Sequence, residues 1–305
     1  DPARPRDFFQ DWASARNLTL GRPVYEDQAL TLRDYLGLDT AGKPVNIRYN
    51  AHPPTSVLLA LPLAGLDYAA AGWWWNVASL ALLAGSLVAI GRALRWRPSP
   101  WAVAPALMLL LTWVPLWLHT LQGQLGLVLL ALLTAAWLAG RRGHDRLCGA
   151  LLGLAATIKL FPLLLLGLLA LRGRWRGVAA GLLAAAAATL ATAAVMGTAP
   201  FVTYLTVVVP ALDRWRPDWI NASLAGYFAR LFAPDAQTTP LLPSPPLATA
   251  LTLLAALTTV AVVARATLAG RRLWPGRAAH APAAPPADDF DGTFALALTA
   301  MLLLS

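Results

Sequence analysis

The chain has 305 residues, of which 58% are hydrophobic and only 13% are charged. Soluble domains average about 45–50% apolar and about 25% charged residues, so this composition excludes an ordinary soluble fold. The single cysteine, Cys148, excludes an intrachain disulfide, and the four histidines form no metal-binding cluster in the sequence.

Residues 1–54 form a polar segment ahead of the first long apolar run. Asp7 at one end and Gly21 at the other predict a helix that is capped by Asp7 and ends near Leu20. Asp11 follows Asp7 by one helical turn, which puts both carboxylates on one face. Two such acids can differ in protonation, leaving one as a base. The alternative is a helix cap beside an ordinary solvated face.

Several apolar segments are long enough to cross a membrane. A hydrocarbon core of about 30 Å takes roughly 20 helical residues, and the segments that qualify are 69–91, 101–120, 123–140, 177–199 and 247–269. The shorter run 55–66 is expected to lie in the membrane interface. The predicted fold class is therefore all-α: a polytopic integral membrane helical bundle with a helical first outer loop.

The segment 147–171 is long enough to span but contains Lys159 and Pro162. Proline removes a backbone hydrogen bond, and arginines flank both ends, so we expect a broken or re-entrant helix. A spanning helix with two basic flanks is the alternative. An ionisable group this deep usually faces a polar cavity or a ligand, so Lys159 suits an anionic partner such as a phosphate. The alternative is that Lys159 pairs with a neighbouring helix and has a purely structural role.

Arginine clusters predict the orientation of the chain. They lie within 92–97, 141–146, 172–176 and 265–277. The positive-inside rule assigns these clusters, with the Ala/Pro-rich linker 278–290, to the cytoplasm. Residues 1–54 carry seven basic and seven acidic groups, so this loop and the second loop, 200–246, are expected outside. The net charge of +9 then reflects topology, and no nucleic acid partner is implied.

Other polar residues are weaker candidates. Gln124 joins two apolar helices, His52 precedes two prolines, and Asn221 belongs to a polar patch in the second loop. Each is equally compatible with a turn, a helix entry or a solvated loop. The stretch 289–291 matches the metal-binding D-x-D pattern, but it flanks a helix on the predicted cytoplasmic side, so we assign it no metal. Phosphate-loop and dinucleotide-binding motifs are absent from the sequence.

The ends of the chain predict missing segments. It begins at Asp1 rather than methionine and ends inside the apolar run 291–305, which as a helix spans only about 22 Å. We therefore expect a single membrane domain over 1–305 that is incomplete at both termini.

The order of these motifs resembles glycosyltransferase family 87, which belongs to the GT-C superfamily of integral-membrane glycosyltransferases. The first part of the resemblance is Asp7-Phe8, Trp12, Ala15-Arg16, Gly21 and Tyr25, followed by Pro53-Pro54 and Leu61-Pro62-Leu63. It continues through Gly123-Gln124, Arg141-Arg142, Gly149-Ala150-Leu151-Leu152-Gly153, Ile158-Lys159-Leu160-Phe161-Pro162 and Asn221-Ala222-Ser223-Leu224. The family includes polyprenol-phosphate-mannose-dependent mannosyltransferases.

The resemblance implies an enzyme that moves a hexose, with mannose as the expected sugar, from a polyprenyl-phosphate donor to a lipid or glycan acceptor. Transfer would occur with inversion on the outer face of a bacterial plasma membrane, within a catalytic loop at 1–54. By its position in the motif, Asp7 is the expected general base, with Asp11 as the runner-up. Expected donor-phosphate or substrate contacts are Lys159, Arg48, His52, Gln124 and Asn221. No cofactor or metal site is expected, and dependence on a divalent metal is left open.

Two other classes fit parts of the sequence. A transporter or flippase for a lipid-linked substrate would also have a broken helix and a lysine at mid-membrane. The sequence has no inverted repeat, and transport does not require the acid-bearing loop. In a non-catalytic scaffold, Asp7 would only cap its helix.

Overall fold

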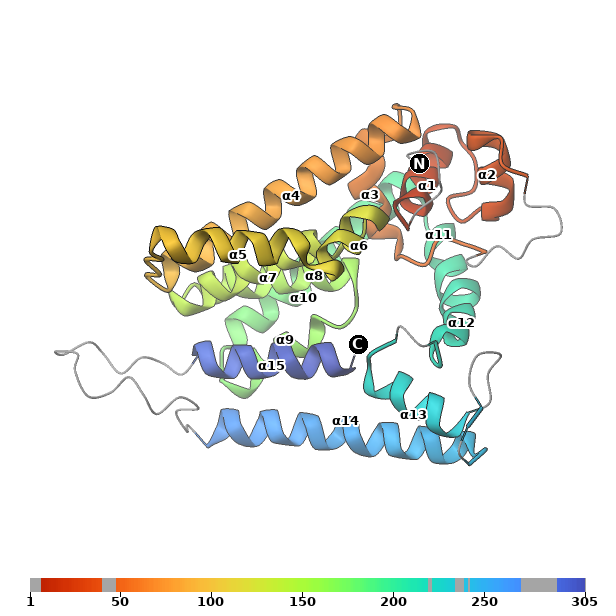
Figure 1. The fold of residues 1–305 in the computed structure, drawn as a ribbon. Coiled ribbons are helices and arrows are strands. Elements are labelled where there is room, and N and C mark those ends of the chain that lie inside the picture. Colours follow the sequence, from red (N-terminus) through yellow and green to blue (C-terminus); the bar gives the residue numbers. More distant parts are fainter. Residues whose placement is uncertain are drawn as a thin grey trace. The chain divides into compact units, whose positions relative to one another are not determined.

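A computed structural model describes residues 7–39, 48–218, 221–233, 239–240, 242–269 and 290–304. All regular secondary structure in these ranges is helical (Figure 1). The chain divides into two compact units. The first comprises residues 1–135 and 186–209, and the second comprises 136–185 and 210–305.

The first unit begins with a helix that is buried on nearly every side. This helix, α1 (Asp7–Thr19), contacts α2 (Gln28–Leu36), α3 (Pro54–Ala60), the short η1 (Leu61–Leu63) and α4 (Tyr68–Ala93). Nine of its thirteen residues are buried. The Trp12 indole donates to the Leu63 carbonyl at 3.3 Å, and Arg16 donates to the Ala64 and Leu66 carbonyls, each at 3.1 Å. These contacts hold α1 against the turn that leads into α4.

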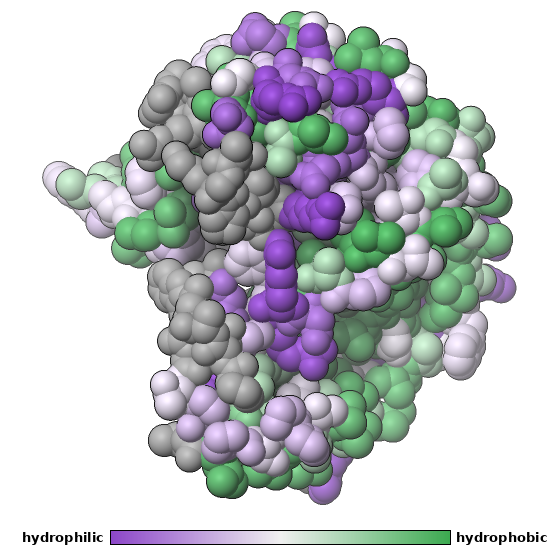
Figure 2. Space-filling view, turned by 90° about the vertical axis from the view of Figure 1, so that its right-hand side faces the viewer, coloured by the Kyte–Doolittle hydropathy of each residue, from purple (hydrophilic) through white to green (hydrophobic). Residues whose placement is uncertain are grey.

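The surface around α2 is charged. The Arg22 guanidinium lies 2.8 Å from the Asp34 carboxylate and 3.5 Å from Glu26. Asp27 caps α2 by accepting from the Ala29 amide, and Gly37 ends it with a left-handed φ of 65°. Strongly hydrophilic side chains gather in the upper half of Figure 2, the height at which Figure 1 draws α1 and α2.

Among the described residues, three helices are long and apolar enough to span a membrane: α4, α10 (Trp175–Met196) and α14 (Pro245–Leu268). They confirm the predicted spans at 69–91, 177–199 and 247–269. The expected span 101–120 is not one straight helix, because α5 (Pro100–Thr112) and α6 (Val114–Gln122) meet at a 51° bend. The cause is Pro115, which lacks an N–H and crowds the preceding turn.

Three apolar helices in the described part of the chain are shorter than a full span, and the first is Pro54–Leu63, formed by α3 and η1. The other two are α7 (Gly126–Arg141), in the segment expected at 123–140, and α15 (Phe290–Leu304). Together with the long helices and the bent pair, they confirm the predicted class, a polytopic helical membrane protein.

The second unit contains the predicted break within 147–171. Helix α8 (Asp145–Ile158) ends at Lys159, whose backbone is extended, and α9 (Leu163–Leu171) begins after Pro162. The two helices contact each other. The broken helix is therefore confirmed. A proline at this point accounts for the break, because it cannot continue the hydrogen bonds of α8.

The rest of the second unit packs around α14. It contacts α9, α15 and α13 (Leu224–Phe232), and Figure 1 shows α13 and α15 lying along it. Four short elements lead from α10 towards α13: α11 (Ala199–Thr203), the π-helical η2 (Tyr204–Val208), α12 (Val209–Leu212) and η3 (Asp213–Trp215). The first two of these belong to the first unit.

Glycines bring α8 and the start of α10 into backbone contact. A side chain at Gly149 would collide with the backbone of Gly177, and one at Gly153 would collide with that of Gly181. Such close approach is typical of helices that pack through small residues in membranes.

Charged residues form ion pairs near the ends of helices in the second unit. Arg141 pairs with Asp291 at 2.9 Å, and the Trp137 indole donates to the same carboxylate at 2.9 Å. Arg174 lies 3.1 Å from Asp145. Asp291 of the D-x-D stretch is thus engaged in a structural ion pair. Asp289 and most of the predicted linker 278–290 lie outside the described residues.

Candidate active site

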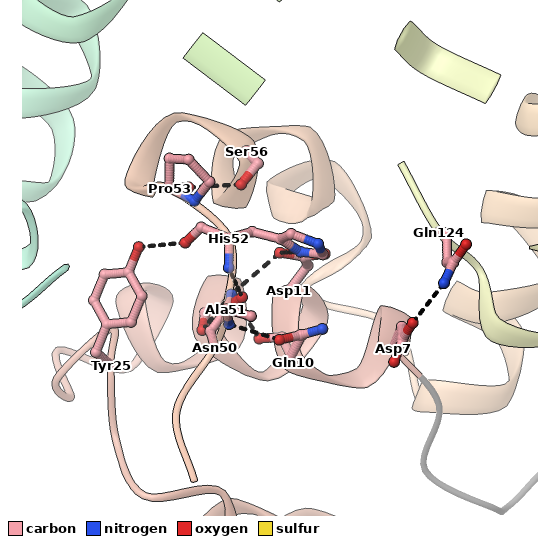
Figure 3. Close-up of polar contacts among 11 residues, drawn as sticks. Asp7, Gln10, Asp11, Tyr25, Asn50, Ala51, His52, Pro53, Ser56 and Gln124 are labelled. Atoms are coloured by element: carbon pink, nitrogen blue, oxygen red, sulfur yellow. Dashed lines mark hydrogen bonds and ion pairs between the residues drawn. The ribbon is translucent and has the colours of Figure 1, made fainter. Parts of the chain in front are cut away.

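The two acids of α1 have different partners, although they are one helical turn apart. Asp7, the first residue of α1, is half-buried. Its Oδ2 accepts a hydrogen bond of 2.9 Å from Nε2 of Gln124. Gln124 follows Gly123, which ends α6 in a left-handed conformation with a φ of 66°. The fold therefore joins two predicted site residues that are 117 positions apart (Figure 3).

Asp11 lies inside the first unit and holds His52. The Asp11 side chain is only 2% exposed and that of His52 is 15% exposed. Nδ1 of His52 lies 2.9 Å from one Asp11 carboxylate oxygen and 3.1 Å from the other. Because a carboxylate only accepts hydrogen bonds, Nδ1 is the donor. This contact fixes the ring and leaves Nε2 as the atom available to other partners.

Asn50 organises the backbone around this pair. Its amide nitrogen donates to the Gln10 carbonyl, to Oδ1 of Asp11 and to the Ser14 hydroxyl, each at 3.1 Å. Its amide oxygen accepts from the His52 backbone N–H at 2.9 Å. Figure 3 shows Asn50 and His52 lying against Gln10 and Asp11 of α1. Asn50 therefore links the buried carboxylate to the segment that carries the histidine.

Tyr25 binds the backbone of His52. Its hydroxyl donates to the His52 carbonyl at 2.6 Å (Figure 3). Burial raises the pKa of this hydroxyl strongly, and the nearby Tyr204 and Asp11 raise it further. Tyr25 therefore keeps its proton and acts here as a hydrogen-bond donor.

Arg48 supports the same loop from the exposed surface. Its Nε lies 2.9 Å from the Asp27 carboxylate, and its carbonyl accepts from the Gln28 backbone N–H at 2.9 Å. The hydrogen bond to Asp27 is the main reason that the Arg48 pKa is raised. The structure thus shows Arg48 joined to the beginning of α2.

The remaining predicted site residues, Lys159 and Asn221, lie in the second unit. Lys159 occupies the break between α8 and α9, half-buried, with Nζ 6.0 Å from the centre of the Phe161 ring. Asn221 donates to the Arg216 carbonyl at 3.0 Å and accepts from the Ser223 backbone N–H at 3.0 Å. Its side chain thus shapes the turn before α13.

The chemistry that these groups can perform is proton transfer and the binding of hydroxyl or phosphate groups. Asp7 offers a carboxylate at the exposed edge of the first unit, and His52 offers one oriented ring nitrogen. No group of three or more metal-ligating side chains occurs within the described residues. Sequence reasoning assigned no role to Asn50 or Gln10. The only available signal was an asparagine two positions before His52.

The apolar helices define the class of the protein first: it is a polytopic membrane protein. The model of glycosyltransferase family 87 matches residues 50–285, well over half of the chain, so the protein belongs to this family. It is therefore a membrane glycosyltransferase, which uses a sugar donor and an acceptor. No curated protein and no solved structure matches the chain. The family match includes His52 and Gln124 and begins after Asp7 and Asp11.

Proposed function

We propose that this protein transfers a hexose, with mannose as the expected sugar, from a polyprenyl-phosphate donor to a lipid or glycan acceptor. Transfer occurs with inversion, on the extracytoplasmic side of a bacterial plasma membrane. The loop 1–54 and the loop 200–246 lie outside in this proposal. The arginine clusters support that orientation, because positive charge is retained in the cytoplasm.

Asp7 is the proposed general base, and its hydrogen bond to Gln124 is the observation that carries the proposal. A base must reach the acceptor hydroxyl at hydrogen-bond distance, and Asp7 is the more accessible of the two acids on α1. Gln124 holds one carboxylate oxygen at 2.9 Å, which leaves the other oxygen for the substrate. Asp11 is 2% exposed and bound to His52, so in this proposal it positions the histidine.

The reaction then balances as a single displacement. The acceptor oxygen attacks the anomeric carbon and passes its proton to the Asp7 carboxylate. The bond from the anomeric carbon to the phosphate oxygen breaks, and the polyprenyl phosphate leaves with that electron pair. Cationic or hydrogen-bonding groups stabilise the developing phosphate charge. We assign Lys159 and Nε2 of His52 to this role, while Arg48 and Asn221 hold their loops.

The test is a transfer assay with the full chain in lipid nanodiscs. Polyprenyl-phosphate mannose, with polyprenyl-phosphate glucose in a parallel assay, is supplied with glycolipids extracted from a strain that lacks the gene. We expect a glycosylated lipid whose new linkage has the opposite anomeric configuration to the donor, as measured by NMR and mass spectrometry. Retention of configuration would contradict the proposal. In proteoliposomes, movement of intact donor across the bilayer without transfer would identify a flippase.

A further inference from the structure

A small cavity lies in the first unit beside the Asp7–Gln124 pair. It is lined by Phe8 of α1, by the first two turns of α4 and by the end of α6 up to Gly123. Phe8 and Gly123 are the sequence neighbours of Asp7 and Gln124. The volume is about 210 Å³, whereas sites for drug-sized ligands are about 300–1,000 Å³. The cavity therefore has the size for one small ring rather than an extended chain.

Aromatic rings form one wall of this cavity. The Phe8 and Trp75 rings stack with their centres 4.8 Å apart, and the centre of the Tyr68 ring lies 6.4 Å from that of Phe8. Gly123 allows the turn to close onto them. A Cβ atom there would lie 2.7 Å from Cβ of Phe8 and 3.4 Å from Cδ1 of Trp75. The pyrrole edge of Trp75, which carries its N–H group, is therefore close to Gly123.

Two of the residues that line the cavity, Trp75 and Asn76, each have a buried polar atom without a partner among the described residues. Trp75 is 6% exposed, whereas its neighbours Trp73 and Trp74 are 59% and 52% exposed. Within the described part of the chain, neither the Trp75 indole N–H nor the Asn76 amide oxygen has a hydrogen-bond partner. Leaving such groups unpaired costs free energy, so a buried unpaired group needs an explanation. A bound ligand would supply the missing partners.

The chemistry of the wall favours a sugar ring. A sugar hydroxyl both donates and accepts, so neighbouring hydroxyls match one N–H donor and one amide oxygen. The C–H face of a pyranose packs on aromatic rings, whose faces carry negative charge. None of the lining residues is charged, which disfavours a phosphate. An acyl chain would leave both polar atoms unpaired.

We propose that this cavity binds the pyranose ring of the acceptor. The Trp75 N–H donates to one hydroxyl, and the Asn76 oxygen accepts from another. The acceptor, rather than the donor, is chosen because the base must contact the acceptor hydroxyl, and Asp7 lies directly beside Phe8 in α1. This assignment to the acceptor rests on the proposed function, whereas the binding of a sugar ring rests on the cavity alone.

The first test is sugar binding without any donor. The full chain in nanodiscs is titrated with methyl α-mannopyranoside and with methyl β-glucopyranoside, and binding is measured by saturation-transfer NMR. Trp75→Phe keeps an aromatic ring and removes the N–H, so affinity should fall roughly two- to tenfold. Asn76→Leu should have a similar effect. Trp74→Phe is the matched control on the same helix, at an exposed position, and should bind as the wild type does.

The possible outcomes distinguish the binding of a sugar in the cavity from the proposed transfer reaction. Absence of binding to the wild type, or wild-type affinity in both the Trp75 and the Asn76 variants, would overturn the inference. If Trp75→Phe does not fold, the sugar affinity of Asn76→Leu decides whether the inference holds. In the transfer assay the acceptor KM should rise while the donor KM is unchanged, and the reverse result would overturn the acceptor assignment. Sugar binding in a protein that transfers nothing would refute only the proposed function.

Discussion

The polar cluster beside α1 and the glycine contact between α8 and α10 hold their helices in different ways. Around α1, side chains form hydrogen bonds at defined distances, from Asp7 to Gln124 and from Asp11 to His52. Between α8 and α10, Gly149 and Gly177 let two backbones touch, with no side chain between them. The first arrangement orients chemical groups, whereas the second only brings helices together. Substitutions at the glycine contact should therefore lower mainly the stability of the protein, whereas substitutions in the polar cluster should lower mainly its activity.

The largest expected effect is loss of folding from the glycine contact. Gly149→Leu would force a side chain into the backbone of Gly177, and overpacking of this kind costs about 3 kcal/mol or more. We expect Tm in detergent to fall sharply. Gly167→Leu on α9 is the matched control, because a Cβ atom there meets nothing within 4 Å. An unchanged Tm in the Gly149 variant would show that the two backbones are not in contact.

A smaller and more specific effect is expected at Asp11. Asp11→Asn keeps the shape but removes the charged acceptor of the His52 Nδ1–H group, and a charged hydrogen bond of this kind corresponds to about ten- to a hundredfold in rate. We expect kcat to fall by that factor and Tm to fall less than in Gly149→Leu, because the amide keeps the shape of the side chain but loses a buried charged hydrogen bond.

A double-mutant cycle with His52→Gln distinguishes positioning from general damage. If Asp11 acts through His52, the double variant should lose little more activity than either single variant. Additive losses in kcat would mean that the two residues act independently, and the proposed positioning role of Asp11 would then be wrong.

The next effect concerns the donor. Lys159→Met removes a cation at the break between α8 and α9, and we expect the donor KM to rise about tenfold because the phosphate loses a charged partner. Lys159→Arg keeps the charge and should restore most of the affinity. A donor KM equal to that of the wild type in Lys159→Met would remove this lysine from the phosphate site.

The smallest effect is expected at Arg48. Its ion pair with Asp27 is exposed, and exposed ion pairs contribute little to stability. Arg48→Ala should leave kcat and both KM values within about twofold of the wild type. A large rise in the donor KM would instead restore Arg48 to the group of phosphate-binding residues.

Much of the fold followed from local patterns. Apolar length predicted five spans, and in the described residues three of them are straight helices of spanning length. Pro162 predicted the break that the structure has after Ile158. The bend at Trp113 was missed, although Pro115 carried the same signal as Pro162. The apolar run 101–120 is long enough to span, and apolar length alone does not show where a proline bends the helix.

The site was predictable only as separate residues. Asp7, His52 and Gln124 were each singled out from their positions beside apolar segments. Helical spacing placed Asp7 and Asp11 on one face, yet it gave no indication that Asp11 is buried against His52 while Asp7 bonds Gln124. Those contacts join residues 41 and 117 positions apart. They depend on how α1 packs against the rest of its unit, which local spacing does not determine.

The most direct test of the account compares Asp7→Asn with Asp67→Asn. Asp67 is an exposed acid of the same unit that caps α4 through the Ala70 amide, so it controls for loss of charge at a helix start. With polyprenyl-phosphate mannose, Asp7→Asn should lower kcat by about a hundredfold or more while still binding the donor. Asp67→Asn should transfer at the wild-type rate. Full transfer by the Asp7 variant would contradict the account.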